Sequence, residues 1–67
     1  MKIILNNRDE SFELEQMNIV QLLEQKNFSF KMLVIKVNGK LIRKTEYEST
    51  LVKDGDEVMV LHLISGG

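Results

Sequence analysis

The chain has 67 residues, no cysteine, a single histidine and a formal net charge of −1. Without cysteine the chain cannot form a disulfide framework, and with one histidine it has too few soft ligands for a zinc site. It also lacks the excess of positive charge that nucleic-acid binding requires. A chain of this length forms one domain, residues 1–67, whose core has to consist of aliphatic packing. No apolar run at the start is long enough for a signal peptide or a membrane span, so we expect a cytoplasmic protein that does not bind membranes.

The first predicted elements are two short strands. Residues 2–6 are mostly apolar, residues 7–10 are polar and turn-prone, and residues 11–14 alternate polar and apolar side chains with period two. We expect these segments to form a β-hairpin in which Ile4 lies on the face turned away from the core.

A helix is predicted over residues 18–26. Asn18 is a favourable N-cap and Gln21 follows three residues later, which is the spacing of a capping box. Apolar residues then recur on one helical face, and Asn27 tolerates the left-handed conformation that ends many helices.

A second hairpin follows the helix. Residues 32–37 are β-prone, and Asn38-Gly39 suits a type I′ turn, in which both central residues have positive φ. Residues 40–42 form the return strand. Because Lys36 belongs on the solvent side of its strand, Val34 shares that outward face.

The last third of the chain contains its longest β-prone run. Residues 43–53 look irregular, with room for a short helical turn, and residues 54–56 form a tight turn before a strand over residues 57–64. The order strand, strand, helix, strand, strand, strand predicts an α+β roll. We expect a mixed sheet of four or five strands with one main helix across one face, and with the first and last strands side by side and parallel.

The last predicted strand is apolar on both faces, although a single helix covers only one face of a sheet. The uncovered face, which also carries Ile4 and Val34, would be an exposed apolar patch, and such patches are typical of partner-binding surfaces. Alternation places Met59, Leu61 and Leu63 together on one face but does not say which. Cover by loops and a homodimer interface are equally compatible with this pattern.

The chain ends in Gly66-Gly67. One interpretation is a terminal segment without function, since chain ends are often disordered. The other is chemical. A terminal carboxyl group has to enter the active site of the enzyme that activates it, and glycine lets the backbone approach closely and bend freely. We expect residues 64–67 to form a flexible tail.

Together these features resemble the ubiquitin-like sulfur carriers, and most closely the ThiS family of thiamin biosynthesis. The resemblance is carried by three stretches: residues 37–39 (Val-Asn-Gly), residues 54–58 (Asp-Gly-Asp-Glu-Val) and residues 64–67 (Ile-Ser-Gly-Gly). Two positions depart from the usual pattern. Arg43-Lys44 stands where the family often has Pro-Arg, and Tyr47 stands in place of a common Trp.

The resemblance implies a β-grasp (ubiquitin-like) fold and a protein co-substrate that has no catalytic residue and binds no cofactor. An E1-like adenylyltransferase would use ATP to adenylate the Gly67 carboxylate, with Ser65 and Gly66 required for activation. Sulfur from a donor such as a cysteine desulfurase would then convert the adenylate to a thiocarboxylate. Thiazole synthase would accept the sulfur.

The family's pattern places Val58 and Val60 in the core, so the predicted partner-binding patch lies on the opposite face. It consists of Ile4, Val34, Met59, Leu61 and Leu63. Two other interpretations stay open: a small subunit of molybdopterin synthase, with the same chemistry and another acceptor, and a ubiquitin-like module whose sheet binds partners while its tail is idle or becomes conjugated to lysines.

Overall fold

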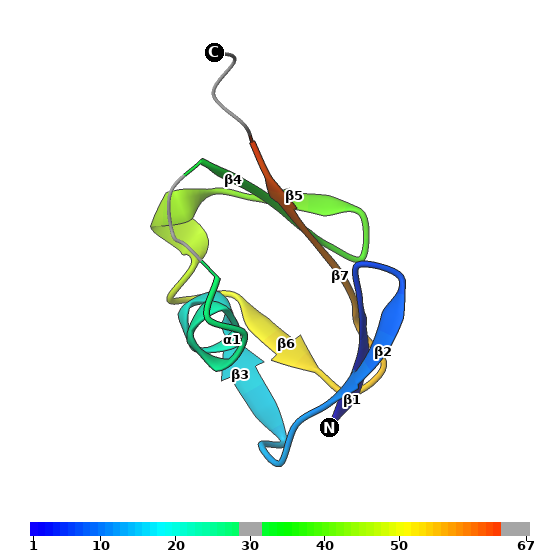
Figure 1. The fold of residues 1–67 in the computed structure, drawn as a ribbon. Helices are drawn as coiled ribbons and strands as arrows, with labels where there is room; N and C mark the ends of the chain where they lie inside the picture. Colours follow the sequence, from blue (N-terminus) through cyan, green and yellow to red (C-terminus); the bar gives the residue numbers. More distant parts are fainter. Residues whose placement is uncertain (29–31, 64–67) are drawn as a thin grey trace.

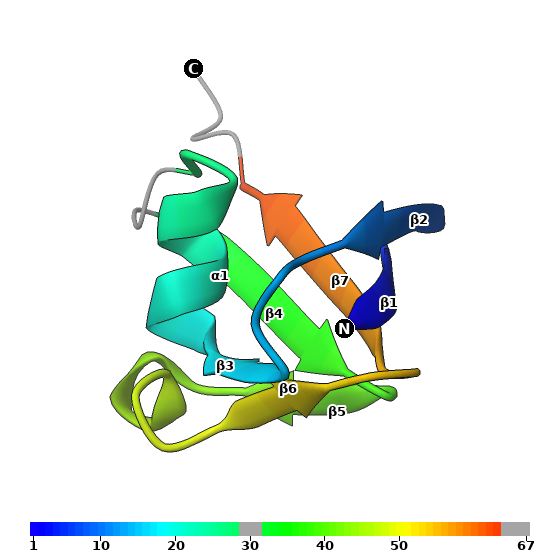
Figure 2. The same ribbon diagram turned by 90° about the horizontal axis from the view of Figure 1, so that it is seen from below.

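The computed structural model describes residues 1–28 and 32–63, and its centre is a five-stranded sheet with one α-helix across one face (Figures 1 and 2). The strand order is β2-β1-β7-β4-β5, and a separate two-stranded sheet pairs β3 with β6. The elements are β1 (Lys2–Leu5), β2 (Arg8–Ser11), β3 (Gln16–Asn18), α1 (Ile19–Gln25), β4 (Leu33–Val37), β5 (Lys40–Ile42), the 3-10 helix η1 (Lys44–Glu46), β6 (Leu51–Lys53) and β7 (Glu57–His62). The predicted α+β roll is confirmed, and the arrangement is that of a β-grasp fold.

The first and last strands, β1 and β7, lie side by side in the sheet and run parallel, as predicted. The Ile4 N–H donates to the Asp56 carbonyl oxygen at 3.0 Å, and the Asn6 N–H donates to the Val58 carbonyl oxygen at 2.9 Å. Parallel neighbours need a long crossover connection, and here that connection contains α1.

The Asn6 side chain extends this pairing after β1 has ended. Its Oδ1 accepts a hydrogen bond from the Val60 N–H at 2.8 Å, and its Nδ2 donates to the Val60 carbonyl oxygen at 3.1 Å. A side-chain amide thereby takes the place of a strand residue. It satisfies both backbone groups of Val60 on the side of β7 that faces β1.

Two-residue turns close both hairpins. Between β4 and β5, Asn38 and Gly39 have φ of 51° and 82°, the positive values that a type I′ turn requires, so this turn is confirmed. Between β1 and β2 the turn is Asn6-Asn7, with φ of 51° and 67°. Our placement of that turn at residues 7–10 and of the strand at residues 11–14 was wrong, because two consecutive asparagines tolerate positive φ and allow a shorter turn.

α1 begins after Asn18 and ends before Asn27, the two residues predicted to bound it. Asn18 Oδ1 accepts from the Gln21 N–H at 2.8 Å while Gln21 Oε1 accepts from the Asn18 N–H at 2.9 Å, which completes the capping box. At the other end Asn27 has a φ of 56°, and the Phe28 N–H donates to the Leu23 carbonyl oxygen at 2.9 Å. This is the hydrogen bond of a Schellman motif.

The two-stranded sheet of β3 and β6 was not predicted. Residues 43–53 were expected to be irregular apart from a helical turn; η1 supplies that turn, but the segment ends in β6, which pairs antiparallel with β3. Each of these strands has three residues, too few to display a period of two. Met17 and Val52 pair at the centre of this small sheet and are buried, so it closes one side of the core.

The core lies between α1 and the inward face of the five-stranded sheet. Ile19, Leu22 and Leu23 come from the helix, and alternate residues of β1, β4 and β7 come from the sheet. Among the described residues no polar or charged side chain is buried, so apolar packing fills the interior. No helix within residues 1–28 and 32–63 is long and apolar enough to span a bilayer.

Replacing Asn6 by Ala should lower the free energy of unfolding by about 1–3 kcal/mol, because Val60 loses both of its partners in a partly buried position. Asn7→Ala is a matched control, since Asn7 has a positive φ in the same turn but no side-chain hydrogen bond within the described part of the chain. Urea unfolding of both variants measures the difference. Equal losses for the two would contradict the bridging role of Asn6.

Candidate functional site

The face of the five-stranded sheet turned away from α1 is rich in apolar side chains, and we call it the outer face. Along β7, Val58 and Val60 are buried, whereas Met59 is half-buried and Leu61 is 47% exposed. Leu63, just beyond the strand, is also exposed. The facing predicted for this strand is confirmed.

The predicted residues of the other strands lie on the same face. Val34 of β4 stands directly opposite Leu61 in the pairing of β4 with β7. Ile4 of β1 is exposed, while its neighbours Ile3 and Leu5 are buried. The outer-face patch therefore brings together the five predicted residues, and their role in binding stays a prediction. They are Ile4, Val34, Met59, Leu61 and Leu63.

One exposed apolar residue of the outer face was missed. Leu41 of β5 is 54% exposed and lies opposite Lys36 in the pairing of β4 with β5. The signal was present in the sequence: a two-residue turn at Asn38-Gly39 fixes the register of the hairpin, and the register places Leu41 beside the outward-facing Lys36.

Lys36 stands in the middle of this apolar surface. It lies opposite Met59 on one side and Leu41 on the other. The one salt bridge among residues 1–28 and 32–63 joins Lys26 to Glu10 at 3.1 Å, so within the described chain Lys36 has no acidic partner. Lys36 therefore places a positive charge between two apolar side chains of the outer face.

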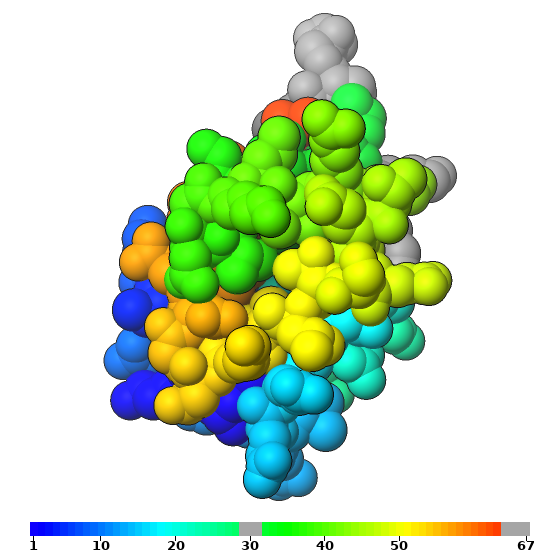
Figure 3. Space-filling view, turned by 180° about the vertical axis from the view of Figure 1, so that it is seen from behind, coloured from blue at the N-terminus to red at the C-terminus, as the bar shows by residue number. Residues whose placement is uncertain are grey.

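The described part of the chain ends just after β7. The Leu63 N–H donates to the Met32 carbonyl oxygen at 2.7 Å, so pairing with the chain that leads into β4 continues one residue beyond the strand. In the space-filling view the last described residues, in red-orange, reach the surface close to the start of β4, in green (Figure 3). The predicted site residues Ser65, Gly66 and Gly67 lie outside the described residues, as does the whole predicted tail over residues 64–67.

His62 and Tyr47 are the polar aromatic side chains at this end of the sheet. The His62 ring packs edge-on against Phe28, with ring centroids 5.2 Å apart. Burial raises the pKa of the Tyr47 hydroxyl above its ordinary value of 10.0. The described residues contain no cluster of three or more potential metal ligands.

Comparison with known proteins identifies relatives over the whole chain. The model of the ThiS family matches residues 2–67. The crystal structure of the thiamine biosynthesis protein (ThiS) from Geobacter metallireducens is 26% identical in sequence, with all of both chains covered and a TM-score of 0.89. The solution structure of a thiamine biosynthesis protein from the same organism is also 26% identical, with all of this chain and 88% of that chain covered and a TM-score of 0.82.

The two faces of β7 should respond oppositely to a charge. Leu61→Asp should change the free energy of unfolding by no more than about 0.5 kcal/mol, the usual range for an exposed position. Val60→Asp should unfold the protein, because it places a carboxylate without a partner in the apolar core. Circular dichroism during thermal unfolding measures both variants. Unfolding of the Leu61 variant would contradict the outward facing.

Proposed function

The chain belongs to the ThiS family, and we propose that it is a sulfur carrier of thiamin biosynthesis whose Gly67 carboxyl group holds the sulfur. The observation that carries this proposal is the family match over residues 2–67, which includes the terminal Gly66-Gly67. The likeness over full length to a thiamine biosynthesis protein, at 26% identity, supports the same pathway.

The proposed chemistry takes place on the terminal carboxylate. An oxygen of the Gly67 carboxylate attacks the α-phosphate of ATP in the active site of an E1-like adenylyltransferase, and pyrophosphate leaves. The outer sulfur of a partner's persulfide, which a desulfurase generates from cysteine, then attacks the acyl carbon and displaces AMP, which gives an acyl disulfide. A second thiol, also from a partner because the chain has no cysteine, reduces this disulfide, and the two partner thiols leave as a disulfide. The product is a thiocarboxylate, whose sulfur passes to thiazole synthase. In this scheme the partners supply every catalytic group and ATP is their substrate, so the chain is a co-substrate.

The fold supports this role through the position of β7. Val58 and Val60 hold the strand in the core, and the Leu63 N–H bonds to the Met32 carbonyl oxygen at 2.7 Å. The strand is therefore held up to the point where the last four residues begin. Fully extended, four residues span at most about 13–14 Å, enough to carry a carboxylate from a docked domain into a cleft of another protein.

The outer-face patch is the surface that we propose for docking these partners. A carrier that meets an activating enzyme and an acceptor in turn has to release each of them, and an exposed apolar patch can contact both. Its half-buried Met59 has a flexible and polarizable side chain that adapts to different surfaces.

A second candidate function is a ubiquitin-like module whose only activity is to bind partner proteins through its sheet. The exposed apolar outer face is the observation that favours it, since such a face suits any protein partner. In that function the terminal carboxylate would carry no sulfur, and this difference separates the two candidates experimentally.

Incubation with the cognate adenylyltransferase, ATP, a desulfurase and cysteine should increase the intact mass by the exchange of one oxygen for one sulfur. Deletion of Gly67, or one extra alanine after it, should abolish the increase without changing the fold, because neither change touches the core. Mass spectrometry gives the first result and a comparison of NMR spectra gives the second. A tail-deleted protein that still supported thiazole formation would contradict the carrier function and favour the binding module.

Leu61→Asp should weaken binding of the adenylyltransferase by at least about tenfold, since it puts a charge in the middle of an apolar contact. Glu24→Lys, an exposed position on α1, is a control on the opposite side of the sheet. Calorimetric titration measures both affinities. Equal affinity of the Leu61 variant and the wild type would exclude the outer-face patch as the docking surface.

A further inference from the structure

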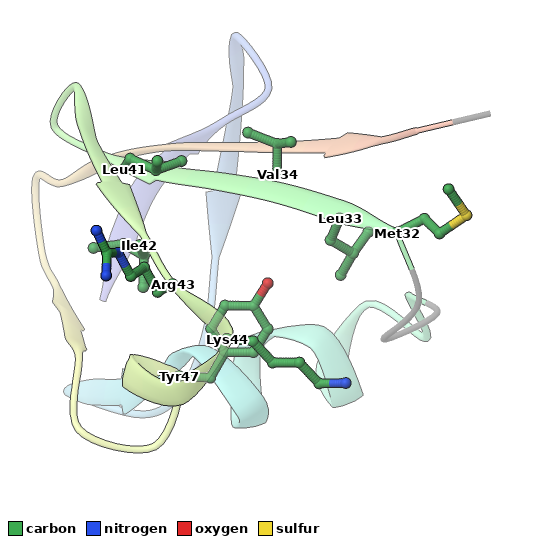
Figure 4. A pocket seen from close by; sticks show the side chains of 8 residues that line it. All are labelled: Met32, Leu33, Val34, Leu41, Ile42, Arg43, Lys44 and Tyr47. Atoms are coloured by element: carbon green, nitrogen blue, oxygen red, sulfur yellow. The ribbon is translucent and has the colours of Figure 1, made fainter. Parts of the chain in front are cut away.

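A hollow of about 620 Å³ lies beside the outer-face patch, between β4 and the segment that contains η1. Its floor is apolar and comes from Leu33, Ile42 and the buried ring of Tyr47, while Met32 and Leu41 form exposed parts of its rim. Figure 4 shows the Tyr47 hydroxyl directed toward β4 from the opposite side of the hollow. We call this hollow the β4–η1 groove.

The groove carries positive charge. Arg43 and Lys44 line it, both are exposed, and neither has an ion-pair partner within the described residues. In Figure 4 their side chains extend to opposite sides of the Tyr47 ring. The one acidic residue between positions 32 and 47 is Glu46, and its carboxylate already accepts a hydrogen bond from the Arg43 N–H at 2.9 Å. The chain as a whole has a net charge of −1, so this basic surface is local.

The groove also lies next to the end of β7. Met32, on its rim, accepts the hydrogen bond from the Leu63 N–H at 2.7 Å. Met32 is 53% exposed and has a φ of 53°, a conformation that costs a methionine more than an asparagine or a glycine. An exposed apolar side chain on a strained backbone gains nothing for the fold, and this combination points to a contact with another molecule.

We propose that the β4–η1 groove binds an extended acidic segment of the adenylyltransferase that activates the terminal carboxylate. One aliphatic side chain of that segment occupies the apolar floor, and carboxylates on either side of it face Arg43 and Lys44. The inference rests on the proposed carrier function and adds the chemistry of the partner. Two observations favour this occupant. The paired cations at an apolar floor select for acidic and apolar residues together, and the groove adjoins Leu63, the last described residue before the terminal residues that the enzyme would activate.

The test uses the adenylyltransferase with ATP and measures pyrophosphate release as a function of carrier concentration. The double variant R43E/K44E should raise KM for the carrier by at least about tenfold and leave kcat nearly unchanged, because the terminal residues are intact once the carrier is bound. Its KM should also lose the salt dependence that the wild type shows. The matched control is R8E/K53E, which changes the net charge equally on β2 and β6, outside the groove.

Met32→Asn is the second variant. Because asparagine suits a positive φ, this change should preserve or raise the thermal stability while it removes the thioether from the rim, and KM should again rise.

A KM for R43E/K44E equal to that of the R8E/K53E control would overturn the groove proposal and leave the carrier function standing. A defect confined to sulfur transfer onto thiazole synthase would also overturn it, by assigning the groove to the acceptor. Absence of any activation of the wild-type chain would overturn the carrier function itself and the groove proposal with it.

Discussion

The parallel pairing of β1 with β7 is the constraint on which the rest of the fold depends. It joins the two ends of the chain in neighbouring strands of one sheet, so the crossover between them has to pass over one face and supplies the only α-helix among the described residues. Asn6 reinforces it where β1 stops, by bonding both backbone groups of Val60 through its side chain. Without this pairing β7 would lose its neighbour on one side, and the core would lose the buried Ile3 and Leu5 of β1.

The same pairing divides β7 into a part that β1 and Asn6 pair and a part that they do not. Its first half lies between β1 and β4, with Val58 and Val60 in the core. Beyond Val60 the β1 side of the strand is no longer paired by β1 or Asn6, while Leu61 and Leu63 stay exposed on the outer face. The pairing with β1 is thus confined to the first part of the strand, where Ile4 adds to the outer-face patch, and the exposed Leu61 and Leu63 continue that patch along the part that β1 does not pair. The β4–η1 groove lies beside this part of the strand, since Met32 on its rim bonds to Leu63.

Sequence patterns predicted the elements that have strong local signals. Three such signals act within a few residues, and the structure confirms all three. They are the capping box of Asn18 and Gln21, the positive φ of Asn27, and the turn at Asn38-Gly39. The β3–β6 pair was missed because its formation depends on the burial of Met17 against Val52, 35 positions apart (52 − 17), and not on any local pattern. The shorter turn at Asn6-Asn7 was missed because a run of polar residues does not show where a turn ends.

The outer-face patch was predicted only in part from the sequence pattern. Alternation grouped the β7 residues of the outer-face patch, but only a family resemblance assigned them to a face, since Val58 and Met59 are both apolar and either could have been inward. The groove could not be predicted, because it forms where η1 folds back toward β4 and brings Arg43 and Lys44 beside Met32 and Leu33.

The central claim, that the terminal carboxylate carries sulfur, is tested most directly by locating the sulfur. After reaction with cysteine labelled with sulfur-34, cleavage after Lys53 releases residues 54–67, which contain no cysteine. Fragmentation should find the labelled sulfur on Gly67, and the heavy isotope separates it from oxidation of Met59. Label on any other residue, or none in this peptide, would contradict the claim.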